Sequence, residues 1–134
     1  MNCRCKTITR KQQDFLGRLA EIGIEACLGG KNSLSYRILF YPCCENLDSD
    51  FEKVFGTTEL SELKACRYND AVEFIAEWFP DDVLMELSVQ MEKDFEKFRY
   101  RYVEEMPQGC PAYQQLMEDF INAICSGTER PYED

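Results

Sequence analysis

Apolar residues recur at three- and four-residue steps along most of this chain, and that spacing constrains it to fold mainly as helices. The first such stretch follows Thr9, which forms with Gln12 the S/T-x-x-E/Q pattern of a capping box. Its apolar face begins at Phe15 and ends just before Gly29 and Gly30. We therefore expect a helix of about five turns that ends at this glycine pair.

Residues 35–41 read Ser-Tyr-Arg-Ile-Leu-Phe-Tyr, an aromatic and β-branched run that is apolar on both faces and is followed by Pro42. That composition predicts a short β-strand. A lone strand leaves its backbone groups unpaired, so this one needs a partner. The candidates are residues 2–8, a further strand that the pattern does not reveal, or a second copy of the chain.

The pattern after Pro42 predicts a loop over residues 43–50 and then helices. Five helical segments are expected: one from Ser49 or Asp50 to Gly56, one from Thr57 or Thr58 through Cys66, one capped by Asn69, a long one over residues 80–105, and a last one over residues 111–127. The segment after Asn69 is expected to be the central, most buried helix, because Phe74 and Trp78 extend its apolar face.

The long helix carries a seam of residues spaced by seven: Leu84, Met91 and Phe98, and beside them Ser88, Phe95 and Tyr102. Such a seam is favoured to pack against the rest of the fold over a partner helix. Gly17 and Gly23 weaken the first helix, and we interpret them as marks of a close helix crossing.

These segments predict a mainly α fold, a compact single-domain helical bundle over residues 1–134 with about six helical segments and one short β-strand or small sheet near residues 35–41. Residues 128–134 are polar and are expected to form a disordered tail. No apolar run approaches the roughly 20 residues that span a bilayer, and the first residues lack the apolar core of a signal peptide. We therefore expect a cytoplasmic protein that makes no membrane contact.

The chain contains no histidine, which excludes imidazole general bases and imidazole metal ligands. No motif indicates a cofactor, and we expect a protein that is not an enzyme. Eight cysteines are present. Three of them, Cys27, Cys66 and Cys125, occupy apolar positions of helices and are interpreted as core residues. The pairs Cys3 with Cys5 and Cys43 with Cys44 could supply four thiolates to a zinc ion, but ordinary reduced thiols are favoured because the sequence has no C-x-x-C.

Charge is divided unevenly between the two parts of the chain. Residues 1–41 hold seven basic and three acidic residues, a net charge of +4, whereas residues 42–134 hold eight basic and 22 acidic residues, a net charge of −14. A chain this acidic is repelled by nucleic acids and by anionic lipids, so direct nucleic-acid binding is not expected. The acidic part is instead suited to dock on a basic protein surface.

Carboxylates crowd two stretches that we predict to bind such a partner: Asp48, Asp50, Glu52, Glu59 and Glu62 after the expected strand, and Asp81, Asp82 and Glu86 at the start of the long helix. In size, acidity and lack of catalytic groups the chain is similar to small phage-encoded antagonists of host defence nucleases, such as anti-CRISPR or anti-restriction proteins. That similarity implies an inhibitor whose partner is a basic protein, such as a nuclease that binds nucleic acid.

Two alternatives stay open. The spacing Glu59-x-x-Glu62 followed by Asp70-x-x-Glu73 resembles the helical E-x-x-E and E-x-x-D of all-α nucleotide pyrophosphohydrolases, with the second pair reversed, and implies a Mg²⁺-dependent phosphohydrolase. The other alternative is a structural or assembly subunit, in which the expected strand or the seam of the long helix forms a homodimer.

Overall fold

The computed structural model describes residues 6–101, 107 and 109–125, and most of them are helical. The helices are, in chain order, α1 (Arg10–Cys27), α2 (Leu34–Phe55), the short 3-10 helices η1 (Leu60–Glu62) and η2 (Ala65–Arg67), α3 (Tyr68–Glu77), α4 (Asp82–Tyr100) and α5 (Pro111–Cys125). The mainly α prediction is thus confirmed, while the expected tail 128–134 lies outside the described residues. Within the part of the chain that the structure describes, no helix is long and apolar enough to cross a membrane.

The capping box of the first helix forms as predicted. The hydroxyl of Thr9 accepts a hydrogen bond from the backbone N–H of Gln12 at 3.1 Å, and the Thr9 N–H donates to Oε1 of Gln12 at 2.9 Å. At the other end, Gly29 and Gly30 have positive φ angles of 90° and 100°, which glycine adopts without strain. Both ends of α1 are therefore set by local sequence.

The strand predicted over residues 35–41 is wrong, as are the loop over 43–50 and the helix start at Ser49 or Asp50. All of these residues belong to one helix, α2, which contains Pro42 in its interior. Apolar residues at four-residue steps on both sides of Pro42 explain why the helix continues: Leu39, Cys43, Leu47 and Phe51 are all buried. Burial of this continuous stripe outweighs a proline penalty of about 3 kcal/mol. Gly56 ends the helix with φ 79°, as predicted.

The described residues contain no β-sheet, only one isolated antiparallel bridge between Thr7 and Lys64. The N–H of Ile8 donates to the carbonyl of Leu63 at 2.9 Å, and the N–H of Ala65 donates to the carbonyl of Lys6 at 2.8 Å. The N-terminal segment therefore pairs with the residues around η1 and η2 and makes no ladder with residues 35–41. Those residues satisfy their backbone groups inside α2.

Between α2 and α3 the structure has two 3-10 helices where one short helix was expected after Thr57 or Thr58. Helix α3 begins at Tyr68, one residue before the predicted Asn69 cap, and no side chain caps it. It is also not the central helix: it packs on α1, whereas α2 contacts α1, α4 and α5. Trp78 is only partly buried at its end, so the apolar face of α3 is narrower than its sequence suggested.

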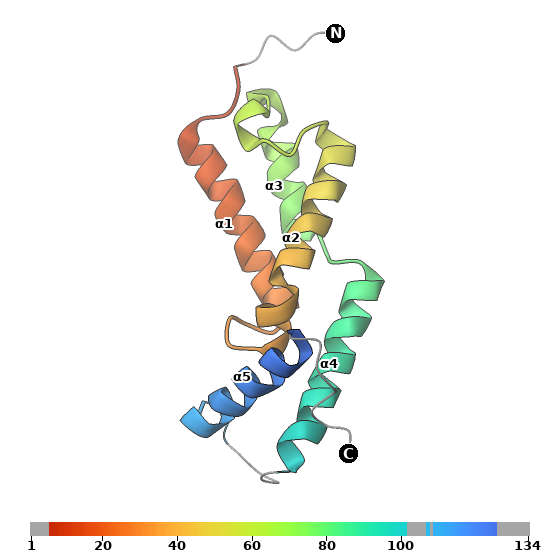
Figure 1. Cartoon of the computed structure of the whole chain (residues 1–134). Coiled ribbons are helices and arrows are strands. Elements are labelled where there is room, and N and C mark those ends of the chain that lie inside the picture. Colours follow the sequence, from red (N-terminus) through yellow and green to blue (C-terminus); the bar gives the residue numbers. More distant parts are fainter. Residues whose placement is uncertain (1–5, 102–106, 108, 126–134) are drawn as a thin grey trace.

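Two apolar clusters fill the elongated bundle, and α2 runs through both of them (Figure 1). One cluster lies between α1, α3 and the C-terminal part of α2, and it includes Leu16, Phe51 and Ile75. The other gathers α4, α5 and the N-terminal part of α2 around Phe95 and Phe120. A long central helix shared by two cores explains the elongated shape.

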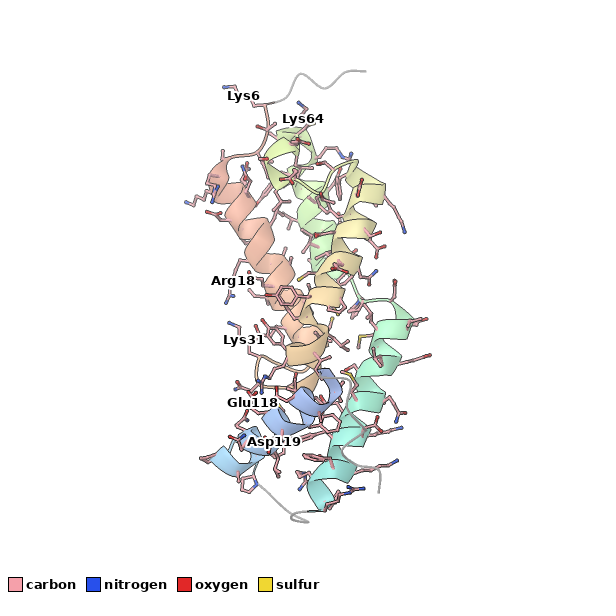
Figure 2. All side chains as sticks on the ribbon, viewed as in Figure 1. Lys6, Arg18, Lys31, Lys64, Glu118 and Asp119 are labelled. Carbon is pink, nitrogen blue, oxygen red and sulfur yellow. The ribbon has the colours of Figure 1, made fainter. Side chains whose placement is uncertain are left out.

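The seam of α4 packs inside the molecule, as favoured by the sequence. Ser88, Met91, Phe95 and Phe98 are buried, and α4 contacts α2 and α5. Leu84 is partly buried, while Tyr102 lies outside the described residues. An ion pair between Arg37 of α2 and Glu118 of α5 closes this end of the bundle, and Figure 2 labels Glu118 on α5.

Two further sequence interpretations are wrong. A Cβ atom added to Gly17 or Gly23 would meet nothing within 4 Å, so neither glycine marks a close helix crossing.

Two of the cysteines interpreted as core residues are also not fully buried. Cys66 is exposed and Cys27 only partly buried, whereas Cys43 is fully buried. The side chain of Cys125 lies outside the described residues. Cys43 was missed because its position was assigned to a loop.

Candidate functional site

Asp50, one of the predicted partner-binding carboxylates, faces another part of its own molecule. Its Oδ2 accepts a hydrogen bond from the indole Nε1–H of Trp78 at 2.9 Å, which joins α2 to the end of α3. The Nζ of Lys53 lies 3.9 Å from the other carboxylate oxygen. Asp50 is therefore already engaged and has an evident structural role.

Asp81 is engaged in a similar way. Its carboxylate accepts a hydrogen bond from Nδ2 of Asn46 at 3.0 Å, and its backbone N–H donates to Oδ1 of Asn46 at 2.9 Å. This reciprocal pair fixes the connection between α3 and α4 against the middle of α2. Asp81 thereby links the start of α4 to α2.

Glu59 and Glu62 lie around η1, at the end of the molecule where Figure 2 labels Lys6 and Lys64. The hydroxyl of Thr57 accepts a hydrogen bond from the backbone N–H of Glu59 at 3.0 Å and donates one to the Glu62 carboxylate at 3.2 Å. This end of the bundle is separate from the start of α4 (Figure 1). The eight predicted carboxylates are thus spread over more than one surface.

Asp48 and Glu52 are exposed one turn apart on α2. Partial loss of solvent around the Asp48 carboxyl raises its pKa above the ordinary value, and the charge of Glu45 raises it further. Burial also raises the pKa of the neighbouring Cys44 thiol. Nearby carboxylates add to that increase: Asp48, Glu21 of α1 and Glu45. This face of α2 is acidic, and thiolate formation is disfavoured on it.

At the start of α4, highly exposed apolar side chains lie next to two of the carboxylates that were predicted to bind a partner. Phe79, in the connection before α4, and Val83 are each 74% exposed, and Leu87 is 44% exposed one turn beyond Val83. Asp82 and Glu86 are exposed beside them and form no ion pair with any residue that the structure describes. We call these five residues the docking surface.

A shallow, open groove of about 330 Å³ adjoins the docking surface. It is lined by Asp82 and Glu86 together with Met85, Val89 and Gln90. Carboxylates therefore border apolar side chains along two turns of α4. Asp82 lies in the first turn, where the helix dipole favours a negative charge, so the carboxylate there stabilises the helix.

Two of the four cysteines that could bind zinc, Cys3 and Cys5, lie outside the described residues. Burial raises the pKa of the Cys43 thiol to about 11, with smaller contributions from Cys44 and Cys27. A metal-binding thiolate needs the opposite shift. Among the described residues, no group of three or more Cys, Asp or Glu side chains is arranged to hold a metal ion.

The carboxylates that resembled a phosphohydrolase motif do not lie on two successive α-helices. Glu59 precedes the three-residue helix η1 and Glu62 ends it, whereas Asp70 and Glu73 lie on α3. The guanidinium of Arg67 is 3.8 Å from the carboxylate of Asp70. The helical E-x-x-E of the pyrophosphohydrolases is therefore not formed by the first pair.

The apolar members of the docking surface were missed from the sequence. None of Phe79, Val83 and Leu87 was predicted to be exposed. One signal was available: Val83 and Leu87 are four apart and lie off the seam that begins at Leu84. The adjacent carboxylates, Asp82 and Glu86, were predicted to bind a partner, and both are exposed.

Comparison with known proteins identifies one family that matches this chain. No curated protein and no solved structure matches the chain. A family model described as the ORF6C domain matches residues 4–88, which extend from before α1 through the docking surface. Because the match covers more than half of the 134 residues, the chain belongs to the ORF6C domain family, which is associated with phages.

Proposed function

We propose that this ORF6C-domain chain is a non-catalytic protein-binding module that docks on a basic surface of a partner protein and inhibits it. The docking surface at the start of α4 makes the contact. The partner is a protein whose basic surface also binds nucleic acid, such as a host defence nuclease. The phage association of the family supports such a role without specifying it.

One observation carries the proposal: Phe79 and Val83 are each 74% exposed next to two carboxylates that have no cation among the described residues. Exposed apolar side chains of this size are uncommon without a binding role when they occur together. Apolar residues at the centre of an interface supply most of the binding free energy, and bordering charges select the partner.

The charge of the chain defines the chemistry of that partner. Residues 42–134 carry a net charge of −14, and Asp82 and Glu86 contribute part of this negative charge beside the apolar side chains. A partner with Lys or Arg side chains around an apolar patch complements such a surface and associates faster than a neutral one. If the same basic surface holds nucleic acid, the chain and the nucleic acid compete for it.

The test uses the full chain as bait in a bacterial lysate, with quantitative mass spectrometry of bound proteins. The docking variant carries Val83→Asp and Leu87→Asp, and the control carries Val54→Asp at an exposed apolar position of α2. We expect a basic protein that is captured by wild type and control, is reduced at least tenfold with the docking variant, and elutes as salt increases.

The captured protein is then purified and mixed with its nucleic acid in a mobility-shift assay. One equivalent of the wild-type chain is expected to displace the nucleic acid, and one equivalent of the docking variant is expected to leave it bound. The proposal is wrong if capture is equal for the wild type and the docking variant, or if the captured protein binds nucleic acid and chain together.

A further inference from the structure

A second cavity, of about 500 Å³, lies where the α1–α2 connection meets α4 and α5. Its volume falls within the range of about 300–1,000 Å³ typical of small-molecule sites. Apolar side chains from the α1–α2 connection, α4 and α5 form much of its wall: Leu28, Met85, Val89 and Met117. The cavity can therefore accept the apolar body of a ligand.

One wall of this cavity is polar and ordered by hydrogen bonds. The hydroxyls of Ser35 and Ser88 lie 2.6 Å apart, and both serines are nine-tenths or more buried. Oε1 of Glu92 accepts hydrogen bonds from the Ser35 hydroxyl at 2.9 Å and from the Ser35 backbone N–H at 3.2 Å. These contacts hold the Glu92 carboxylate in one place at the cavity wall.

Glu92 supplies the only charged side chain among the described residues that line the cavity. Its Oε1 anchors α4 to the first turn of α2, whereas Oε2 makes no hydrogen bond or ion pair with the described residues. The Glu92 side chain is partly buried and lines the cavity, so Oε2 can accept a hydrogen bond from a bound ligand. Burial raises the pKa of the neighbouring Tyr113 phenol, and the charges of Glu96 and Glu92 raise it further, while the charge of Arg99 lowers it.

We propose that this cavity binds a ligand that carries an ammonium group on an apolar chain, with the ammonium at Glu92 and the chain against Leu28 and Met117. An ammonium donates up to three hydrogen bonds and matches a carboxylate oxygen in charge. An anionic ligand would meet repulsion from Glu92. The ammonium belongs either to a free organic amine or to a lysine side chain of a partner protein.

The site does not depend on the docking surface for its chemistry. Glu92 and Met117 lie beyond residues 4–88, so the part of the chain that follows the family match completes the cavity. Ser35 and Ser88 lie within the match. A failed test of the docking surface would therefore leave the amine site standing, and the reverse is equally true.

The test titrates the isotopically labelled full chain with hexylammonium, and follows backbone amide shifts by nuclear magnetic resonance. Hexanol and hexanoate are the neutral and anionic probes of equal chain length. N-acetyl-lysine methylamide reports a lysine side chain, so its binding relative to hexylammonium distinguishes the two sources. We expect the shifts to gather around Ser35, Ser88 and Met117, and hexylammonium to bind at least tenfold more tightly than hexanol or hexanoate.

Glu92→Gln removes the charge and keeps an oxygen acceptor for Ser35, and it is expected to weaken hexylammonium binding about tenfold while hexanol is unaffected. Glu45→Gln, at an exposed position of α2 outside both this cavity and the docking surface, is the matched control and is expected to leave hexylammonium binding unchanged. Asn32→Trp places a bulky side chain at an exposed lining position of the loop, without disturbing the core, and should block every probe.

Equal affinity for hexylammonium and hexanol overturns the proposal, as does an unchanged ammonium affinity in a folded Glu92→Gln variant. Shifts that spread over the acidic surface away from the cavity also overturn it, because they would report nonspecific charge attraction. If Glu92→Gln fails to fold, unaltered binding of hexylammonium to Asn32→Trp overturns the proposal instead. Binding of the lysine probe as tightly as hexylammonium assigns the site to a partner side chain, and binding of hexylammonium alone assigns it to a free amine.

Discussion

The indole N–H of Trp78 donates a hydrogen bond of 2.9 Å to the carboxylate of Asp50, and this contact ties the end of α3 to α2. The two residues are 28 positions apart in the chain. Phe79, the residue that follows Trp78, is 74% exposed. Asp50, a residue predicted to bind a partner, thus contacts the residue that precedes Phe79 of the docking surface.

Trp78→Phe should lower the free energy of unfolding by about 1.5–3 kcal/mol, because it removes a hydrogen bond to a charged acceptor and leaves Asp50 half-buried. Asp50→Asn, which keeps an oxygen acceptor for the indole, should cost less. Urea unfolding followed by circular dichroism measures both. Equal losses in the two variants would show that the hydrogen bond is not the source of the effect.

Pro42→Ala should raise the free energy of unfolding by about 1–3 kcal/mol. The substitution restores a backbone N–H within α2 and removes the ring from the helix interior, although the greater freedom of alanine in the unfolded chain offsets part of the gain. Pro111→Ala is the comparison, because Pro111 is the first residue of α5, where proline is favourable. A stabilisation by Pro111→Ala as large as that by Pro42→Ala would contradict the explanation.

The buried thiol of Cys43 makes stability depend on pH above pH 9. Its pKa is about 11 in the folded chain against an ordinary value of 9.0, so between these values the unfolded chain loses the proton first. The free energy of unfolding should therefore fall as the pH rises from 9 to 11, by about 2–3 kcal/mol from this group. Below pH 9 the contribution is fully present.

The measurement compares wild type with Cys43→Ala by urea unfolding at pH 8 and pH 11. Other groups titrate in the same range and cancel in the difference between the two proteins. The advantage of the wild type should shrink by about 2–3 kcal/mol at the higher pH. Cys66→Ala, at an exposed position, serves as the control and should show no such change. A constant difference for Cys43→Ala would mean that its thiol titrates normally in the folded state.

Phe95→Ala should lower the free energy of unfolding by about 3–5 kcal/mol, because it empties the centre of a core. Phe95 is fully buried, and its ring centroid lies 5.4 Å from those of Tyr113 on α5 and Phe120 on α5. Val83→Ala, in the exposed docking surface, should change stability by less than about 0.5 kcal/mol. Thermal unfolding measures both changes. A large loss of unfolding free energy in Val83→Ala would show that the Val83 side chain is buried in the core.

Local sequence determined the elements whose ends depend on nearby residues. The Thr9 and Gln12 capping box begins α1, and the glycines at 29, 30 and 56 end α1 and α2 with positive φ. The seam of α4 also followed from spacing alone. Each of these features depends on interactions within one or two turns, and such interactions can be read from a single sequence.

Tertiary structure decided the rest. Residues 35–41 have the composition of a strand, yet they are helical because Leu39 and Cys43 must lie on one buried stripe against α4 and α5. At the start of α4 the sequence pointed to the carboxylates Asp82 and Glu86 but not to the exposed Phe79, Val83 and Leu87. Whether an apolar side chain is exposed or buried depends on which other helices pack against it. Those helices are distant in the sequence, so local propensity does not predict their contacts.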